Sequence, residues 1–160
     1  MADADLRFRL VGASWNIVFS REVLRFLYSH AQGAWRKTEV AGQLFTADLT
    51  AAVVRIELAT LLPVTKGSRT SVRIDVGRAD DERKRLFGDG LHCVGLWHTH
   101  PEPMPRPSYE DLQLAKDHAL AARSNLTGIV FVIIGTMPFP EGLLVGVHDG
   151  RIFTPAPLCD

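Results

Sequence analysis

The sequence predicts an α/β fold, a mixed β-sheet flanked by helices, and three observations carry that prediction. Residues 129–134 form an apolar, largely β-branched run, which is typical of a central strand buried on both faces. A second apolar run, 94–97, ends at two histidines. Segments 20–30, 79–87 and 108–124 have the caps and spacing of helices, so strands alternate with helices along the chain.

Length and charge describe an ordinary globular chain. With 160 residues and 46% hydrophobic content, it can bury roughly two thirds of its unfolded surface, so one domain spanning residues 1–160 is expected. Lys plus Arg and Asp plus Glu both number 18, which leaves no net field to attract nucleic acid or an anionic membrane. Neither of these is an expected partner.

Cysteine usage and the first residues indicate the compartment. Cys93 lies inside an apolar run and Cys159 is far from it in sequence, so reduced thiols are expected. Residues 1–7 are acidic where a signal peptide needs positive charge, and no apolar run reaches the ~18 residues of a membrane span. The expected location is the cytoplasm.

The N-terminal part predicts short strands and one helix. Residues 6–19 alternate around a glycine and are expected to form one or two strands. Ser20 can cap a helix that ends near His30 and Gly33. The apolar stripe of this helix consists of Val23, Leu24, Phe26 and Leu27.

A predicted hairpin follows. Glu39 opens its first strand, which continues through Phe45, and residues 52–58 form the second strand. From periodicity alone Glu39 is an ordinary charged residue at a strand edge. Glu22 and Glu57 are then equal candidates for any catalytic role.

Loop and helix signals occupy the middle of the chain. Residues 65–70 form a polar loop, and its Arg69 is interpreted as a solvated side chain. Residues 71–76 are expected to add a short strand. Residues 79–87 carry acids first and bases later, with Gly88 after them, which is typical of a helix aligned with its dipole.

The last third predicts a helix and three strands. The helix after Ser108 has a narrow face of small residues that favours close packing on a sheet. After the strand 129–134, residues 143–147 and 151–153 flank Asp149-Gly150, a strong hairpin signal. His148 adjoins that turn and is expected to be exposed.

Two histidines separated by one residue, His98 and His100, follow the apolar run 94–97. At strand spacing their side chains leave the same face of a sheet about 7 Å apart, so one metal ion can bind both imidazoles. Zinc binds neutral imidazole nitrogens and carboxylate oxygens, and a catalytic zinc site keeps three protein ligands plus a water. A third ligand is therefore expected.

Asp111 is the candidate for the third ligand. Four prolines stiffen the connection after His100, and Ser108 looks like a helix start, so a carboxylate in the first turn can lie beside the strand end. The same segment also fits a capping box, in which Asp111 accepts a hydrogen bond from the Ser108 amide. From spacing alone the ligand role and the capping role both stay open.

These residues together resemble the motif of the JAMM/MPN (JAB-domain) zinc metalloproteases, H-x-H-P-x6-S-x2-D with a glutamate strand upstream. The resemblance extends over nearly the whole chain. One departure is Ala41, which stands where many members have the first of two glycines, and this bears on substrate fit rather than on metal binding. The matching positions are Glu39, His98, His100, Ser108 and Asp111.

The resemblance implies a fold, a cofactor and residue roles. The fold would be a JAMM/MPN-like, cytidine-deaminase-like sandwich. The cofactor would be Zn2+, bound by His98, His100 and Asp111. Glu39 would move the proton of the zinc-bound water, and Ser108 would stabilise the oxyanion.

The resemblance also implies a function. Members with the full motif cut isopeptide or peptide bonds after the C-terminal tail of ubiquitin or a ubiquitin-like protein. The small size is similar to stand-alone bacterial members, which accompany ubiquitin-transfer-like enzymes in antiphage operons, including cyclic-oligonucleotide (CBASS) systems. The expected partners are a ubiquitin-like protein or its conjugate and the transfer-like enzymes of the same operon.

Two other functions stay open. The same chemistry can process a sulfur-carrier precursor or another substrate that is not ubiquitin-like. An MPN scaffold, in contrast, binds partners without catalysis. The presence of all five motif residues argues against the scaffold.

Overall fold

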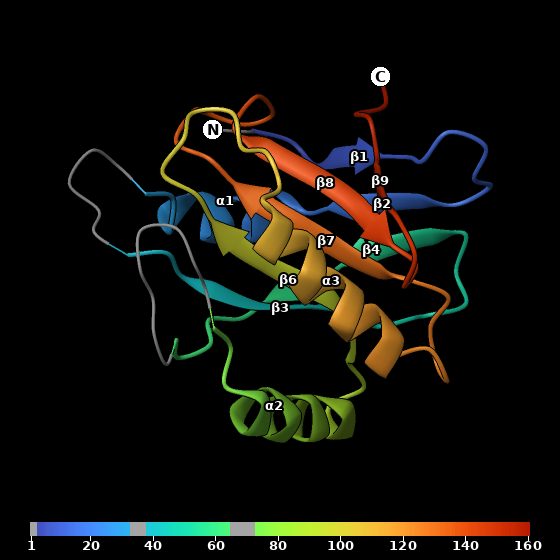
Figure 1. Ribbon diagram of the computed structural model, residues 1–160. Helices are drawn as coiled ribbons and strands as arrows, with labels where there is room; N and C mark the ends of the chain where they lie inside the picture. The colour runs from blue at the N-terminus through green and yellow to red at the C-terminus, as the bar shows by residue number, and fades with distance from the viewer. Residues whose placement is uncertain (1–2, 33–37, 65–72) are drawn as a thin grey trace.

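The computed structural model describes residues 3–32, 38–64 and 73–160, which form strands and helices in alternation (Figure 1). In chain order the elements are β1 (Leu6–Phe8), β2 (Asn16–Phe19), α1 (Arg21–Ser29), β3 (Ala41–Thr46), β4 (Val53–Ile56), β5 (Leu58–Ala59), α2 (Val76–Gly88), β6 (His92–Thr99), α3 (Tyr109–Ala121), β7 (Ile129–Ile134), β8 (Leu143–His148) and β9 (Phe153–Pro155).

The strands form two mixed sheets. The larger sheet has the order β5-β3-β6-β7-β8-β9, in which only β6 and β7 are parallel neighbours. The smaller sheet has the order β1-β2-β4, with β2 and β4 parallel. The predicted mixed α/β fold is confirmed, and the second sheet is an addition to it.

The predicted hairpin partner of β3 is partly wrong. Within the run 52–58, β4 pairs in parallel with β2 in the smaller sheet, and β5 pairs antiparallel with β3. The chain changes sheets at Glu57, whose amide donates to the Phe45 carbonyl. Ile56, the last residue of β4, is fully buried in the core cluster that also contains Phe19 and Leu44. Local periodicity cannot predict such a contact between distant segments.

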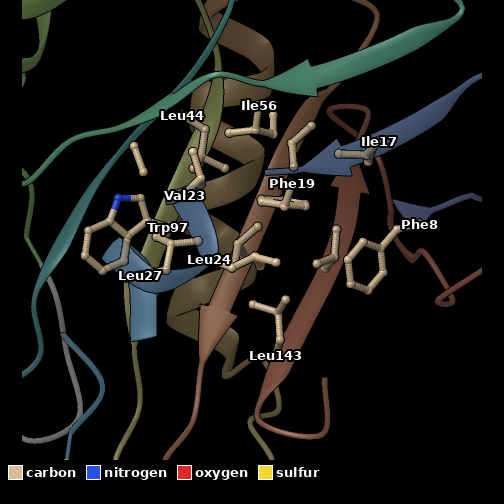
Figure 2. Packing of buried hydrophobic residues seen from close by; sticks show 14 of the residues in the cluster. Phe8, Ile17, Phe19, Val23, Leu24, Leu27, Leu44, Ile56, Trp97 and Leu143 are labelled. Carbon is tan, nitrogen blue, oxygen red and sulfur yellow. The ribbon is translucent and has the colours of Figure 1, made fainter. Parts of the chain in front are cut away.

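Strand β7 is central, as its apolar sequence predicts, and its two faces contact different layers. One face packs against α1 and the smaller sheet (Figure 2), and the other packs against α3 (Figure 1). The first face is formed by Val130, Val132 and Ile134, and the second by Ile129, Phe131 and Ile133.

Side-chain caps set the helix starts. Ser20 accepts a hydrogen bond from the Val23 amide at the start of α1, as predicted. Asp75 caps α2, so this helix begins three residues earlier than predicted. Of the expected strand 71–76, the described residues contribute a single bridge, Val64 to Ile74. The predicted loop 65–70 lies outside the described residues.

Gly42 marks the tightest approach of β3 to a neighbouring segment. A Cβ atom there would lie 1.6 Å from the Thr60 carbonyl oxygen and 2.6 Å from Trp97 Nε1. Trp97 Nε1 donates to the same Thr60 carbonyl at 2.8 Å. A shift of the Thr60 carbonyl would therefore also disturb its hydrogen bond with Trp97. The position requires a residue without a side chain.

Gly42→Ala is therefore expected to lower the free energy of unfolding by about 3 kcal/mol, the upper end for overpacked sites, because the backbone must move. Gly88→Ala is the matched control, because no atom lies within 4 Å of its added Cβ. Urea unfolding of the two variants and wild type measures the difference. Equal stability of Gly42→Ala and wild type would contradict the packing described above.

Within the described residues, no helix is long and apolar enough to cross a membrane. Both Cys93 and Cys159 are free thiols, as expected, and burial raises the pKa of Cys93.

Candidate metal centre

The predicted site residues meet where β6 ends and α3 begins. In the antiparallel ladder of β3 and β6, Ala41 pairs with His98. Two residues further along, the same register places Glu39 opposite His100. The Thr99 amide donates to the Val40 carbonyl at 3.0 Å, which continues the ladder towards this pair. Glu39 thus precedes β3 by two residues, whereas the sequence predicted that it opens the strand.

The Thr99 side chain secures the same contact. Its Oγ1 accepts a hydrogen bond from the Val40 amide at 3.0 Å. The sequence patterns described above do not assign Thr99 a role. The sequence feature that could have indicated this role is the hydroxyl side chain between the two histidines.

The two histidines point to a common spot. Their Nε2 atoms lie 3.1 Å apart, and both side chains are buried. The His98 ring also packs on Phe131, with ring centroids 5.3 Å apart. The expected same-face arrangement is present.

Asp111 contacts both imidazoles. Its Oδ1 lies 2.9 Å from His98 Nε2, and its Oδ2 lies 2.9 Å from His100 Nε2. Oδ2 also accepts from the Ser108 amide at 2.7 Å, while Ser108 Oγ accepts from the Asp111 amide at 3.1 Å. The capping box is therefore confirmed, and the same carboxylate also faces the histidine pair.

Glu39 approaches the histidines from β3. One ligand atom from each of Glu39, His98 and His100 lies within 4.8 Å of the other two. Glu39 is 2% exposed, and its Oε2 is buried without a hydrogen-bond partner among the described residues. The other candidates, Glu22 and Glu57, are exposed and lie near arginines. The structure thus gathers all five predicted residues at one place.

Burial and hydrogen bonds shift the charges of the cluster. Burial raises the pKa of Glu39 to about 7. Burial opposes ionisation of Asp111, but hydrogen bonds from His100 and His98 hold its pKa well below the usual range. Burial also disfavours charged His100, yet hydrogen bonds with Asp111 and Glu102 raise its pKa to about 9. Burial lowers the pKa of His98.

The donor set fits a divalent metal ion of the zinc type. Two imidazole nitrogens and a carboxylate are the ligands that catalytic zinc sites use. Glu39 Oε2 and His98 Nδ1 are buried polar atoms that have no hydrogen-bond partner within residues 3–32, 38–64 and 73–160. An unpartnered buried polar atom costs about 1–3 kcal/mol, a penalty that a cation or its water beside Glu39 would relieve.

Metal binding is expected to release protons. A pKa of about 9 means that His100 is protonated below that pH in the metal-free protein, and a metal ligand must be neutral. Zinc affinity should therefore fall as pH falls, by about tenfold per pH unit for each proton displaced. Calorimetric titration with zinc at pH 7 in two buffers of different ionisation enthalpy counts these protons. We expect at least one proton to be released per zinc ion bound. Release of no proton would contradict a protonated His100 in the metal-free protein.

A carboxylate that the sequence analysis missed also belongs to the site. Glu102 Oε1 lies 2.7 Å from His100 Nδ1, on the side of the ring away from Asp111. The sequence feature that could have indicated this contact is an acidic residue two positions after His100. The second ring nitrogen of a metal-binding histidine commonly donates a hydrogen bond to such a carboxylate.

A hollow of about 400 Å³ lies beside Glu39 at the edge of the larger sheet. Its lining is Thr38, Glu39, Val40, Leu61, Leu62 and Val64. A larger hollow of about 640 Å³ lies between α2, β6 and α3, and none of the clustered metal-site residues lines it. Of these two hollows, the smaller is therefore the one that a residue of the cluster, Glu39, lines.

His92, His118 and His148 lie away from the cluster. His92 begins β6 and packs on Phe87, and His118 lines the larger hollow. His148 was predicted to be exposed, but it is 3% exposed, and its Nδ1 accepts from the Gly150 amide at 3.0 Å. That prediction was wrong because the residue ends β8 with its side chain turned inward to close the turn.

The comparisons with known proteins agree with this geometry. A family model described as prokaryotic homologues of the JAB domain matches residues 20–145, which include every residue of the cluster. A search of curated proteins gave no match. Among solved structures, the solution structure of a protein from Desulfitobacterium hafniense matches with a TM-score of 0.64 and 19% identity. The match covers 89% of this chain and 88% of that one, which shows a shared fold.

Proposed function

The chain belongs to the family of prokaryotic homologues of the JAB domain, and from that premise we propose that it is a zinc-dependent peptidase or isopeptidase. The observation that carries the proposal is the contact of Asp111 with both histidines beside a buried, unpartnered Glu39. Hydrolytic zinc sites use such a set of side chains, in which two histidines and one carboxylate bind the metal and a second carboxylate acts as the base.

The two carboxylates take different roles in this proposal. Asp111 lies 2.9 Å from each Nε2 atom and is held in place by the Ser108 amide, so it is the third ligand. Glu39 keeps an oxygen free, and burial raises its pKa to about 7. A base that titrates near neutral pH suits proton transfer better than permanent coordination.

The reaction is hydrolysis of an amide bond. A zinc ion held by His98, His100 and Asp111 would supply Lewis acidity, which would make the attacking water more acidic and polarise the carbonyl. Glu39 accepts the proton of the attacking water and donates it to the leaving amine. Ser108 Oγ stands beside Asp111 and assists the developing oxyanion, an effect of about 2.7–4 kcal/mol in other hydrolases.

The proposed substrate is an extended C-terminal tail of a ubiquitin-like protein or of its conjugate. Support comes from the hollow beside Glu39, whose lining includes the apolar side chains of Leu61, Leu62 and Val64. Beside this hollow, β3 is covered by β5 and by the residues that follow it, because the Thr60 and Leu62 amides donate to the Gln43 and Ala41 carbonyls at 3.0 and 2.9 Å. This outer segment therefore forms the edge of the larger sheet. An extended peptide can add to such a sheet edge through main-chain hydrogen bonds.

Trapping tests the substrate class. Glu39→Ala protein, loaded with zinc, is incubated with lysate of its own host, and bound species are identified by intact mass and fragment masses. Wild-type protein is then added to each purified species. Release of a product that ends in a ubiquitin-like tail supports the proposal. Cleavage of only unrelated short peptides, or of a sulfur-carrier precursor, would move the chain to another substrate class.

A role in antiphage defence, in the cytoplasm beside ubiquitin-transfer-like enzymes, completes the proposal. It rests on the resemblance of the motif to stand-alone bacterial members. Phage plating on host strains that carry the wild-type gene or Glu39→Gln tests it. Equal plating efficiency on both strains would remove the defence role and leave the chemistry unaffected.

A further inference from the structure

We propose that Glu102 is a positioning residue that fixes His100 with its proton on Nδ1, so that Nε2 is the nitrogen presented to the metal. The inference rests on the proposed metal centre and deepens it. Its basis is the contact of Glu102 Oε1 with His100 Nδ1 at 2.7 Å, together with the way the loop holds Glu102 in place.

His100 needs such support more than His98 does. His98 lies within β6, is 1% exposed and packs on Phe131. His100 follows the last residue of β6, so a loop carries its backbone. Its Nδ1 has a carboxylate partner, whereas His98 Nδ1 has no hydrogen-bond partner in the part of the chain that the structure describes. Burial therefore orients one imidazole, and a hydrogen bond orients the other.

The backbone of the loop is held against the end of β7. The His100 amide donates to the Ile134 carbonyl at 2.8 Å, and the Thr136 amide donates to the Glu102 carbonyl at 3.0 Å. These bonds extend the β6–β7 ladder into the loop, which Figure 1 shows beside the end of β7.

Gly135 permits this approach. A Cβ atom there would lie 2.6 Å from the Glu102 carbonyl oxygen and 2.4 Å from the Pro103 carbonyl oxygen. The absence of a side chain lets the loop close on β7, so the Glu102 backbone has a defined position.

The Glu102 side chain is also anchored. Its Oε1 accepts from the Arg106 amide at 3.2 Å, in addition to its contact with His100. A carboxylate on the second nitrogen of a metal-binding histidine fixes the tautomer and raises the basicity of the ligand nitrogen. Loss of such a partner typically weakens metal affinity by about 10–100-fold.

Zinc affinity, measured by competition with a chelator, tests the role of Glu102. Glu102→Ala should weaken zinc binding by about 10–100-fold, and Glu102→Gln, which keeps an acceptor oxygen, should weaken it less. Glu110→Gln is the matched control, because this exposed acid in the first turn of α3 makes the same charge change. The control should keep wild-type affinity.

A nitrogen-15 spectrum of the zinc-loaded protein provides a second readout that a purely structural role would not move. Wild type should show a proton on His100 Nδ1, and Glu102→Ala should lose or weaken that signal. Unchanged zinc affinity in Glu102→Ala, or a proton on Nε2 of His100 in wild type, would overturn the proposed role. If wild type itself binds no zinc, the metal centre fails, a result distinct from failure of the Glu102 role alone.

Discussion

Glu39→Gln protein is expected to bind one zinc ion per chain with unchanged affinity and to lose about 10²–10⁴-fold in turnover. The amide keeps the size of the side chain but cannot accept the proton of the attacking water. Because Glu39 Oε2 has no protein partner, the substitution disturbs no other contact of that oxygen. Zinc content and hydrolysis of the trapped substrate are measured on the same preparation.

Glu57→Gln is the matched control for Glu39→Gln. Glu57 is an exposed acid near Arg55, and it should keep both zinc and turnover. If Glu39→Gln retained wild-type turnover, Glu39 would not be the base. If it lost zinc, Glu39 rather than Asp111 would be a ligand, which is the other triad that the cluster permits.

Asp111→Asn is expected to weaken zinc binding by more than about 100-fold, beyond the usual effect of a residue that only supports a ligand. The amide oxygen can still accept from the Ser108 amide, so the start of α3 should be preserved. Metal affinity and helical content, by circular dichroism, are measured together. This variant therefore separates the two roles that the sequence left open for Asp111.

Ser108→Ala is the complementary variant. It removes the hydroxyl that accepts from the Asp111 amide, and loss of such a cap costs about 0.5–2 kcal/mol of stability. Zinc should remain bound, because the Asp111 carboxylate stays. If Asp111→Asn kept its zinc, the carboxylate would serve only as the cap of α3.

The sequence predicts the parts of the candidate site whose geometry depends on neighbouring residues. The strand spacing of His98 and His100, and the helix start that carries Asp111, are properties of neighbouring residues. The position of Glu39 has a different origin. It follows from the register of β3 against β6, so local pattern alone left Glu22 and Glu57 as equal candidates.

The errors in the fold have the same origin. The partner of β4 depends on which sheet buries Ile56, and the burial of His148 depends on how β8 ends. Both depend on strand pairing, because β4 pairs with β2 and His148 lies where β8 pairs with β7 and β9. Glu102 was missed for the opposite reason. It is close in sequence, but its role becomes visible only when the loop is placed on β7.

The measurement that tests the central claim most directly is the zinc content of wild-type protein purified without chelators, with X-ray absorption at the zinc edge. The proposed function predicts one zinc ion per chain, bound by nitrogen and oxygen atoms at about 2.0–2.2 Å, and its loss in His98→Ala. Protein that stays metal-free in the presence of zinc, or a spectrum with sulfur ligands at about 2.3 Å, would contradict a centre built from His98, His100 and Asp111.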